Sequence, residues 1–376
     1  MKKTSVAEKY YKDLKKASNE IFIQFLWHIY IKINGCLIAE FSKIKHLTGL
    51  DSFTFRQNFL AKLEKGFLVP AYTFDNVNGN FPVGFKIWNT SIKQKFSDFD
   101  FDVYNDKGEM ISTKSIFDYN GLKRINQWLS EYYNNDSLNK LGVMHHGRND
   151  FQSTRGVYIS YFDNKDHTSL ITPLNLHIQC IYFTVYHCIP ANWLNDRDQF
   201  LYPNNGWISD TEFQNDCLAF TLFHGQNRIS SKEGINHWIP FTEEQVNARE
   251  KFDSHFMTDF LRGKILHNYS NTNLFAKSET NKNGKDEPLV FSSESQAVFD
   301  DGLKLWKYYH SKQNVNVNAS LYDIREYFQG RNKQGKMNNK SSDEKYNQLI
   351  ENLKYKLKIL SEKIEPKVYK YGFLKK

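Results

Sequence analysis

Apolar positions in the first part of the chain follow helical and strand spacings in turn. Residues 6–34 carry apolar side chains mostly four apart, which predicts one amphipathic helix that Gly35 ends. Residues 36–40 are predicted to form a short buried strand. Residues 53–64 have the spacing of a second helix, and Gly66 is expected to end it.

Four apolar segments with strand character follow. Phe67–Phe74 and Phe81–Trp88 are predicted to be strands joined by a short polar loop. Phe99–Tyr104 and Met110–Phe117 predict a hairpin, because the residues 105–108 between them are a strong turn sequence. The order helix–strand–helix–strand–strand predicts an α/β fold. This part would be the closing half of an open, twisted sheet that ends in an antiparallel hairpin.

Beyond Tyr119 the pattern becomes α+β and largely helical. Strands are predicted over Gly156–Phe162 and Ile178–His187. Helices are predicted over Leu122–Tyr133, Asp210–Phe223, Phe241–Phe260, Phe291–His310, Ala319–Phe328 and Asp343–Glu362. Thr242 is expected to cap the third of these helices.

Composition divides the chain into four parts. Residues 1–118 are expected to form the α/β unit and residues 119–268 the α+β region. The polar stretch 269–290 is predicted to be a linker, and residues 291–376 a basic helical segment. With 376 residues, of which 40% are hydrophobic, the chain exceeds one typical domain.

The sequence contains no signal for a membrane or for disulfide bonds. No apolar run reaches the roughly 18 residues that cross a membrane, and no apolar segment directly follows the basic N-terminus, as it would in a signal peptide. The four cysteines form no C-x-x-C pair. We therefore expect reduced, buried thiols in a cytoplasmic protein.

The net charge of +8 is concentrated in one segment. Residues 331–376 hold 13 Lys and Arg against 5 Asp and Glu, whereas the residues before them balance. Such a segment is expected to contact a polyanion, and its lysines Lys354, Lys356 and Lys358 are candidate contacts to a DNA backbone. The alternative is a solvated Lys-rich helix, because Lys and Asn are abundant throughout the chain.

A second group of candidate phosphate contacts lies in the turn Gly330–Met337. Its sequence matches G-x-x-x-x-G-K, but Met337 stands where a P-loop has Ser or Thr, and the turn follows a predicted helix. Nucleotide binding of the P-loop type is therefore not expected. Arg331, Lys333 and Lys336 are predicted instead to contact DNA phosphates, with an ordinary surface turn as the alternative.

A polar cluster begins with His145 and His146 and ends at Asp150. Two histidines near an aspartate are compatible with a metal-dependent nuclease. However, adjacent residues of a strand point to opposite faces, and no second ligand pair has a suitable spacing. We therefore favour a basic loop in which Arg148 and Asn149 contact DNA. The histidines at positions 177, 187, 224 and 237 are interpreted as core or turn residues.

The segment Gly66–Trp88, with the helix and strand before it, resembles the closing half of an N6-adenine DNA methyltransferase of the type I and type IIG restriction–modification kind. Three later segments are similar to large bacterial adenine methyltransferases: Phe223–Arg228, Asn236–Glu243 and Asn318–Gly330. The resemblance runs through most of the chain, and it implies a DNA-recognition role for the region beyond residue 119.

The resemblance also implies roles for single residues. Phe74 would stack on a flipped adenine, with Phe81 as the second candidate and Asn76 of the loop as a polar contact. The alternative is that Phe74 only packs in a hydrophobic core. Glu40 is interpreted as the ion-pair partner of a basic neighbour.

The opening half of such an enzyme is missing from the sequence. No two glycines are closer than five residues and all eight prolines stand alone. Neither a G-x-G-x-x-G or F-x-G-x-G loop for S-adenosylmethionine nor an Asn/Asp-Pro-Pro-Tyr/Phe motif is therefore present.

Without these motifs, the resemblance predicts an incomplete adenine-specific DNA methyltransferase that is not active alone. Double-stranded DNA would be its substrate. A separate N-terminal half or subunit would bind S-adenosylmethionine and supply the missing motifs. The alternative is a stand-alone DNA-binding or partner-recruiting protein of a phage-defence system, without catalysis.

Overall fold

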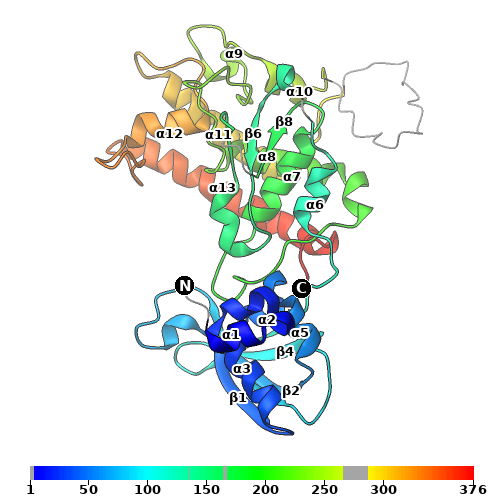
Figure 1. The fold of residues 1–376 in the computed structure, drawn as a ribbon. Helices are drawn as coiled ribbons and strands as arrows, with labels where there is room; N and C mark the ends of the chain where they lie inside the picture. The colour runs from blue at the N-terminus through cyan, green and yellow to red at the C-terminus, as the bar shows by residue number, and fades with distance from the viewer. Residues whose placement is uncertain (1–3, 135, 164–166, 266–286) are drawn as a thin grey trace, which may run out of the picture.

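The computed structural model describes residues 4–134, 136–163, 167–265 and 287–376. Their buried apolar side chains form two core clusters, one within residues 14–116 and one within residues 125–374. In Figure 1 the elements of the first cluster (blue to cyan) lie at one end of the molecule, and the remaining helices lie at the other. The second cluster includes residues from both sides of the predicted linker 269–290. Residues 269–286 of that linker lie outside the described residues.

The first part is built on a five-stranded mixed sheet. In sheet order its strands are β1 (Leu37–Lys43), β3 (Pro82–Asn89), β2 (Lys62–Pro70), β4 (Asp98–Tyr104) and β5 (Met110–Phe117). The strand β3 runs antiparallel to both of its neighbours, so β1 and β2 run in the same direction with a reversed strand between them. The pair β2–β4 is parallel, and β4–β5 is an antiparallel hairpin. The predicted α/β class is confirmed.

Short helices gather against one face of this sheet (Figure 1). They are α1 (Ser5–Lys9), α2 (Tyr11–Leu14), α3 (Ile21–Lys32), α4 (Lys45–Thr48) and α5 (Phe53–Asn58). Ile38 and Trp88, paired across β1 and β3, point into the shared core, where Trp88 meets Phe59 edge-on at 5.3 Å between ring centroids. Alternate residues of these strands therefore face the opposite side of the sheet.

The second part combines a small sheet with a helical body. Its antiparallel sheet has the order β7 (Tyr158–Ser160), β6 (Gly142–His145) and β8 (Thr168–Ile171). Its helices are α6 (Ile125–Ser130), α7 (Leu176–His187), α8 (Thr211–Phe223), α9 (Glu243–Val246), α10 (Phe256–Leu261), α11 (Ser293–His310), α12 (Leu321–Gln329) and α13 (Glu344–Lys370). The helices α7 and α8 are buried along almost their whole length, and the long helix α13 packs on α8 and α11.

Three predictions of local structure in the first part are wrong. Residues 6–34 do not form one helix, because Lys15 has a left-handed φ of 49° that ends α2. The second helix ends at Asn58, since the chain from Lys62 onward pairs with β3. Gly66 therefore ends no helix but lies inside β2, where a Cβ atom would be 2.9 Å from the carbonyl oxygen of Phe85.

Predictions in the second part are wrong at two elements. Ile178–His187, predicted as a strand, belongs to the helix α7; a helix buried on all sides has no polar stripe by which its period could be recognised. Phe241–Phe260 contains two short helices, α9 and α10, although Thr242 does cap the first of them in a capping box with Gln245. The predicted helix Asp343–Glu362 is confirmed as α13, which continues to Lys370.

Among the described helices, none combines the length and the apolar character that a membrane-spanning segment requires.

Candidate functional site

The loop between β2 and β3 carries the residues predicted to contact a base. Phe74 follows the 3₁₀ helix η3 (Ala71–Thr73), and its half-buried ring meets that of Phe41 edge-on at 5.6 Å between centroids. Phe81 lies at the other end of the loop, with Lys43 Nζ 4.5 Å from its ring centroid. Asn76 is exposed and has a φ of 62°, a conformation that Asn tolerates. Both rings thus lie at the carboxyl ends of β1 and β2, the edge where ligands bind in open α/β sheets.

Aromatic rings cover the sheet face opposite the helices. Phe41, Phe67 and Phe85 come from β1, β2 and β3, and their centroids are 4.8 to 5.9 Å apart. Phe41 is nevertheless 52% exposed, and Leu37 on the same strand is 68% exposed. β1 is an edge strand of the described sheet, so its outer backbone groups pair with no described strand. An apolar, unpaired edge of this kind is a template for pairing with another chain.

An ion pair lies inside the sheet on its helix-covered face. Lys86 on β3 is fully buried, and its Nζ is 3.2 Å from Glu40 Oε1 on β1. The ammonium also donates to the carbonyl oxygens of Gly84 and Ser42, at 2.7 and 3.2 Å. Burial lowers the pKa of Lys86 to about 8, and Glu40 opposes that change. The prediction that Glu40 pairs with a basic neighbour is confirmed.

A cavity of about 290 Å³ lies where the two parts of the molecule meet. We call it the junction cavity. The first part lines it with Lys45 and residues 48–51, which follow the carboxyl end of β1; the second part lines it with residues 148–150, Arg197 and Gln199. The structure thereby places Arg148 and Asn149 beside residues that follow the carboxyl end of β1.

Charge and burial are both unusual around the junction cavity. The side-chain oxygen of Asn149 is buried without a hydrogen-bond partner among the described residues. Burial raises the pKa of the neighbouring Asp196 to about 6, while Arg197 and, more weakly, Lys43 act in the opposite direction. Lys43 is the residue that lies over Phe81.

The histidine pair is held by hydrogen bonds and ring contacts within the protein. His145 Nε2 is 2.8 Å from Ser160 Oγ and 2.9 Å from the carbonyl oxygen of Phe162. The ring of His146 lies elsewhere, with Nε2 3.0 Å from the hydroxyl of Tyr133, and burial lowers the pKa of His146 to about 4. In the part of the chain that the structure describes, no cluster of three or more His, Cys, Asp or Glu side chains could hold a metal ion.

A larger cavity, of about 410 Å³, lies in the second part between α12, α13 and the start of the loop after α8. We call it the helical cavity. Lys354 and Lys358 on α13 and Arg325 on α12 line it, and no carboxylate does. Arg325 donates from Nη1 to the carbonyl oxygen of Gly225 at 3.0 Å, and burial lowers its pKa.

The other wall of the helical cavity contains a stack of rings. His224 lies between His187 and Phe220, with centroid separations of 4.7 and 5.0 Å and interplanar angles of 27° and 20°. Burial lowers the pKa of His187 to about 4 and that of His224 well below its ordinary value, so both rings are neutral at pH 7. Both histidines are thus cavity residues, a role that their apolar sequence contexts did not indicate.

The basic segment is not uniformly free to bind a ligand. Lys363 and Lys367 of α13 form ion pairs with carboxylates of the second part: Asp210, Glu212, Asp216 and Glu294. Among the described residues, no carboxylate forms an ion pair with Lys354 or Lys356. Lys358 is 3.7 Å from Glu362, with both side chains largely exposed.

The turn after α12 carries Arg331, Lys333 and Lys336, the residues predicted to contact phosphates. Arg331 donates to Glu326, to the Tyr322 hydroxyl at 2.9 Å and to the carbonyl oxygen of Gly335 at 2.7 Å, so its guanidinium is already engaged within the protein. Lys333 and Lys336 are exposed. The predicted phosphate contacts of this turn therefore depend on its two lysines.

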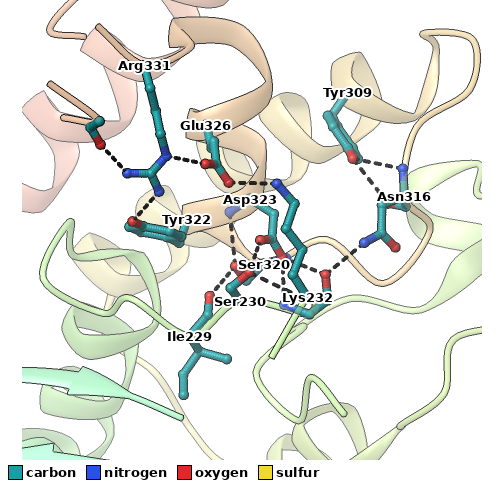
Figure 2. A network of polar contacts seen from close by, with 12 residues as sticks. Ile229, Ser230, Lys232, Tyr309, Asn316, Ser320, Tyr322, Asp323, Glu326 and Arg331 are labelled. Atoms are coloured by element: carbon teal, nitrogen blue, oxygen red, sulfur yellow. Dashed lines mark hydrogen bonds and ion pairs between the residues drawn. The ribbon is translucent and has the colours of Figure 1, made fainter. Parts of the chain in front are cut away.

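A polar network joins α12 to the loop after α8 (Figure 2). Asp323 accepts hydrogen bonds from Ser230 Oγ at 2.6 Å and from Ser231 N and Oγ at 2.9 and 2.7 Å. It also completes a capping box with Ser320. Lys232 pairs with Glu326 at 2.9 Å on the same helix. The network fixes the loop that carries Gly225 against the helix that carries Arg325.

The three later segments that carry the methyltransferase resemblance lie together in space. Phe223–Arg228 contacts Asn318–Gly330 through Arg325 and Gly225. Asn236, in the segment Asn236–Glu243, donates from Nδ2 to the carbonyl oxygen of Asn318 at 2.9 Å. Two of these segments line the helical cavity. Arg325 was not predicted as a site residue, since one arginine within an amphipathic helix gives no sequence signal of its own.

Comparison with protein-family models, with curated proteins and with solved structures found no match for this chain.

Proposed function

We propose that the chain is the C-terminal portion of an S-adenosylmethionine-dependent adenine-N6 DNA methyltransferase of a restriction–modification system. Residues 1–118 complete the sheet of the methyltransferase domain and close the base pocket. Residues 119–376 bind and recognise DNA. The methyl donor and the Asn-Pro-Pro-Tyr motif come from a separate N-terminal half, because the sequence contains no glycine-rich loop that fits the cofactor.

The observation that carries this proposal is the free edge of the five-stranded sheet. The resemblance predicts the closing half of an open sheet that ends in an antiparallel hairpin, and the mixed sheet with the hairpin β4–β5 at its far edge is compatible with that arrangement. Strands of an N-terminal half, added at β1, would pair its outer backbone groups and cover Leu37 and Phe41. The same addition would bring the missing motifs to the edge where Phe74 and Phe81 lie.

The loop and the junction cavity support a base-binding role. A base extruded from a duplex offers two faces for stacking, and each stacked base contributes about 1–3 kcal/mol. Phe74 can offer such a face because Phe41 supports its ring. Arg148 and Asn149 line the junction cavity beside it and are candidates to contact DNA, and the side chain of Arg148 is exposed.

The direct test is methyl transfer from labelled S-adenosylmethionine into double-stranded DNA. The chain is assayed alone and after co-expression with a polypeptide that carries the cofactor loop and the Asn-Pro-Pro-Tyr motif, encoded beside it. We expect no activity from the chain alone and activity from the pair. Methylation by this chain unaided would show that the half-enzyme proposal is wrong.

The edge-strand argument has its own test and a matched control. Phe41→Glu places a charge on β1, and Ile111→Glu places one on β5, the opposite edge, where Ile111 is 53% exposed. We expect the first substitution to abolish co-purification with the N-terminal half and the second to leave it unchanged. Equal effects would refute assembly through β1.

A second candidate function is favoured by the helical cavity: a stand-alone DNA-binding protein without catalysis. Lys354 and Lys358, the lysines of α13 that line it, would serve either function. Phe74→Ala separates the two. Under the first proposal, the substitution abolishes methyl transfer by the reconstituted pair. Under the second, the chain has no methyl transfer to lose, and its DNA affinity stays almost unchanged.

A further inference from the structure

The helical cavity is not used by the methyl-transfer role. It lies in the second part of the molecule, in the helical body, whereas Phe74, Phe81 and the junction cavity belong to the sheet and its boundary. Its volume of about 410 Å³ lies within the roughly 300–1,000 Å³ typical of small-ligand sites. The cavity therefore needs an explanation of its own.

Its charge favours an anionic ligand. Arg325, Lys354 and Lys358 reach it from two helices, and among the described residues no Asp or Glu side chain lines it. Carboxylates do lie along α13. Glu362 is 3.7 Å from Lys358, but it is largely exposed and outside the cavity lining, and Asp210, Glu212, Asp216 and Glu294 pair with Lys363 and Lys367. Three convergent cations without a carboxylate among them are typical of a phosphate site.

The remaining walls favour a ligand that is also flat and apolar. Leu353 and Leu357 alternate with the lysines on α13, while Phe220, Phe223 and the stacked ring of His224 form the opposite wall. Because His224 is neutral at pH 7 and its two faces are covered by His187 and Phe220, this wall adds no charge and presents ring edges. A phosphate joined to an aromatic base matches both halves of the cavity.

The cationic side of the cavity is held in place before any ligand arrives. Arg325 is fixed to the carbonyl oxygen of Gly225, and the Asp323 network fixes the loop that carries Gly225 (Figure 2). A Cβ atom at position 225 would lie 2.9 Å from Arg325 Nη1, so a side chain there would displace the guanidinium. Preorganisation of this kind lowers the cost of binding.

We propose that the helical cavity binds a single nucleotide, with the phosphate on Arg325, Lys354 and Lys358 and the base against the ring and leucine walls. The source of the nucleotide rests on the proposed function. Under that function, the bound nucleotide belongs to a DNA strand and lies at a different position from the methylated base. A free mononucleotide has the same chemistry, and the experiment distinguishes the two sources.

The experiment measures binding of 5′-dTMP, thymidine, a ten-residue oligo-dT strand and a duplex by the full chain, using calorimetry. We expect 5′-dTMP to bind at least tenfold more tightly than thymidine, since thymidine lacks the phosphate. Lys354→Gln combined with Lys358→Gln should weaken 5′-dTMP binding by at least about tenfold, the effect of losing one strong charge-assisted contact. Lys356→Gln, on the same helix but outside the cavity, should change it less than twofold.

A second variant does not alter charge. Gly225→Ala moves Arg325 and should weaken 5′-dTMP binding several-fold, while Gly147→Ala, where a Cβ meets nothing within 4 Å, should not. Circular dichroism verifies that each variant is folded.

The outcomes separate the inference from the proposed function. Loss of 5′-dTMP and oligo-dT binding together in the lysine pair variant supports a strand nucleotide in the cavity. Binding of 5′-dTMP without any binding of the strand or duplex supports a free nucleotide and contradicts the DNA role. Strand binding that the lysine pair and Gly225→Ala leave unchanged, or no preference for 5′-dTMP over thymidine, overturns the inference and leaves the methyltransferase proposal intact.

Discussion

Substitution of Lys86 tests how the reversed strand β3 is held between its neighbours. Lys86→Met keeps the length of the side chain but leaves Glu40 in the core without its ammonium partner. The Glu40 carboxylate would retain only a long contact to Trp88 Nε1, at 3.4 Å. Removing one member of a buried ion pair costs about 3–5 kcal/mol. We expect a loss at the lower end of this range at pH 7, because Glu40 is slightly exposed.

A double-mutant cycle isolates the pair. Glu40→Gln with Lys86→Met removes both charges and should recover most of the stability lost by Lys86→Met alone. Lys65→Met, at an exposed position of β2, is the matched control and should change the free energy of unfolding by less than about 0.5 kcal/mol.

The pH dependence gives a second, independent measure. The pKa of Lys86 is lowered from 10.5 to about 8 in the folded chain. Below pH 8 the folded and unfolded chains both hold the proton, so the cost of burying the charge is fully present. Between pH 8 and 10.5 the folded chain releases the proton while the unfolded chain still holds it. The free-energy cost of burying the charged ammonium therefore falls by roughly 3 kcal/mol over this range. The stability of the wild type relative to Lys86→Met should therefore rise by that amount.

The assay is urea unfolding followed by tryptophan fluorescence at pH 7, 9 and 10.5. Comparison with Lys86→Met cancels the titration of tyrosines and cysteines, which both proteins share. A difference between the two proteins that stays flat across this range would refute a buried, charged Lys86. Additive effects of the two single substitutions would refute its pairing with Glu40.

Three further predictions concern other parts of the chain. Asp323→Ala leaves buried hydroxyl and amide donors unpaired, so it should lower the free energy of unfolding, measured by thermal denaturation, by about 3–5 kcal/mol. The control Asp300→Ala, at an exposed position, should have little effect. Only the partly exposed thiol of Cys36 should react with a thiol reagent in the native protein, because burial shields the other three cysteines, whereas all four should react in urea. A second reactive thiol in the native protein would contradict this burial. DNA affinity should fall steeply with salt, and Lys354→Gln should lower the slope of log affinity against log salt by about 1; salt-independent binding would count against both proposed functions.

Local signals predicted the sheet better than the helices around it. The hairpin β4–β5 was found because its turn residues and alternating strands are short-range features. The strand β2 was found only from Phe67 onward, since Phe59, Leu60 and Leu63 also fit a helical period and only pairing with β3 decides between the two. The helix α7 was missed because burial on all sides removes the contrast between polar and apolar faces.

The candidate sites were predictable in part from charge and not from packing. The excess of lysines on α13 made this helix a candidate for contacting a polyanion, but the sequence could not show that Lys363 and Lys367 are neutralised by acids some 150 positions earlier. Nor could it show that Arg325, His187 and His224 meet Lys354 in one cavity. These residues become neighbours only through the packing of α7, α8, α12 and α13.

The position of the last residues in the larger core has a consequence for how the chain folds during synthesis. Tyr371, Phe373 and Leu374 are buried, and Phe373 meets Trp128 edge-on at 5.4 Å while its carbonyl oxygen accepts from Leu201 N. The sheet unit has its own core within residues 14–116 and can fold while the ribosome is still at work. The larger core cannot close until residue 374 has left the ribosomal tunnel. We therefore expect its exposed apolar surface to need chaperone protection while residues 125–374 are synthesised.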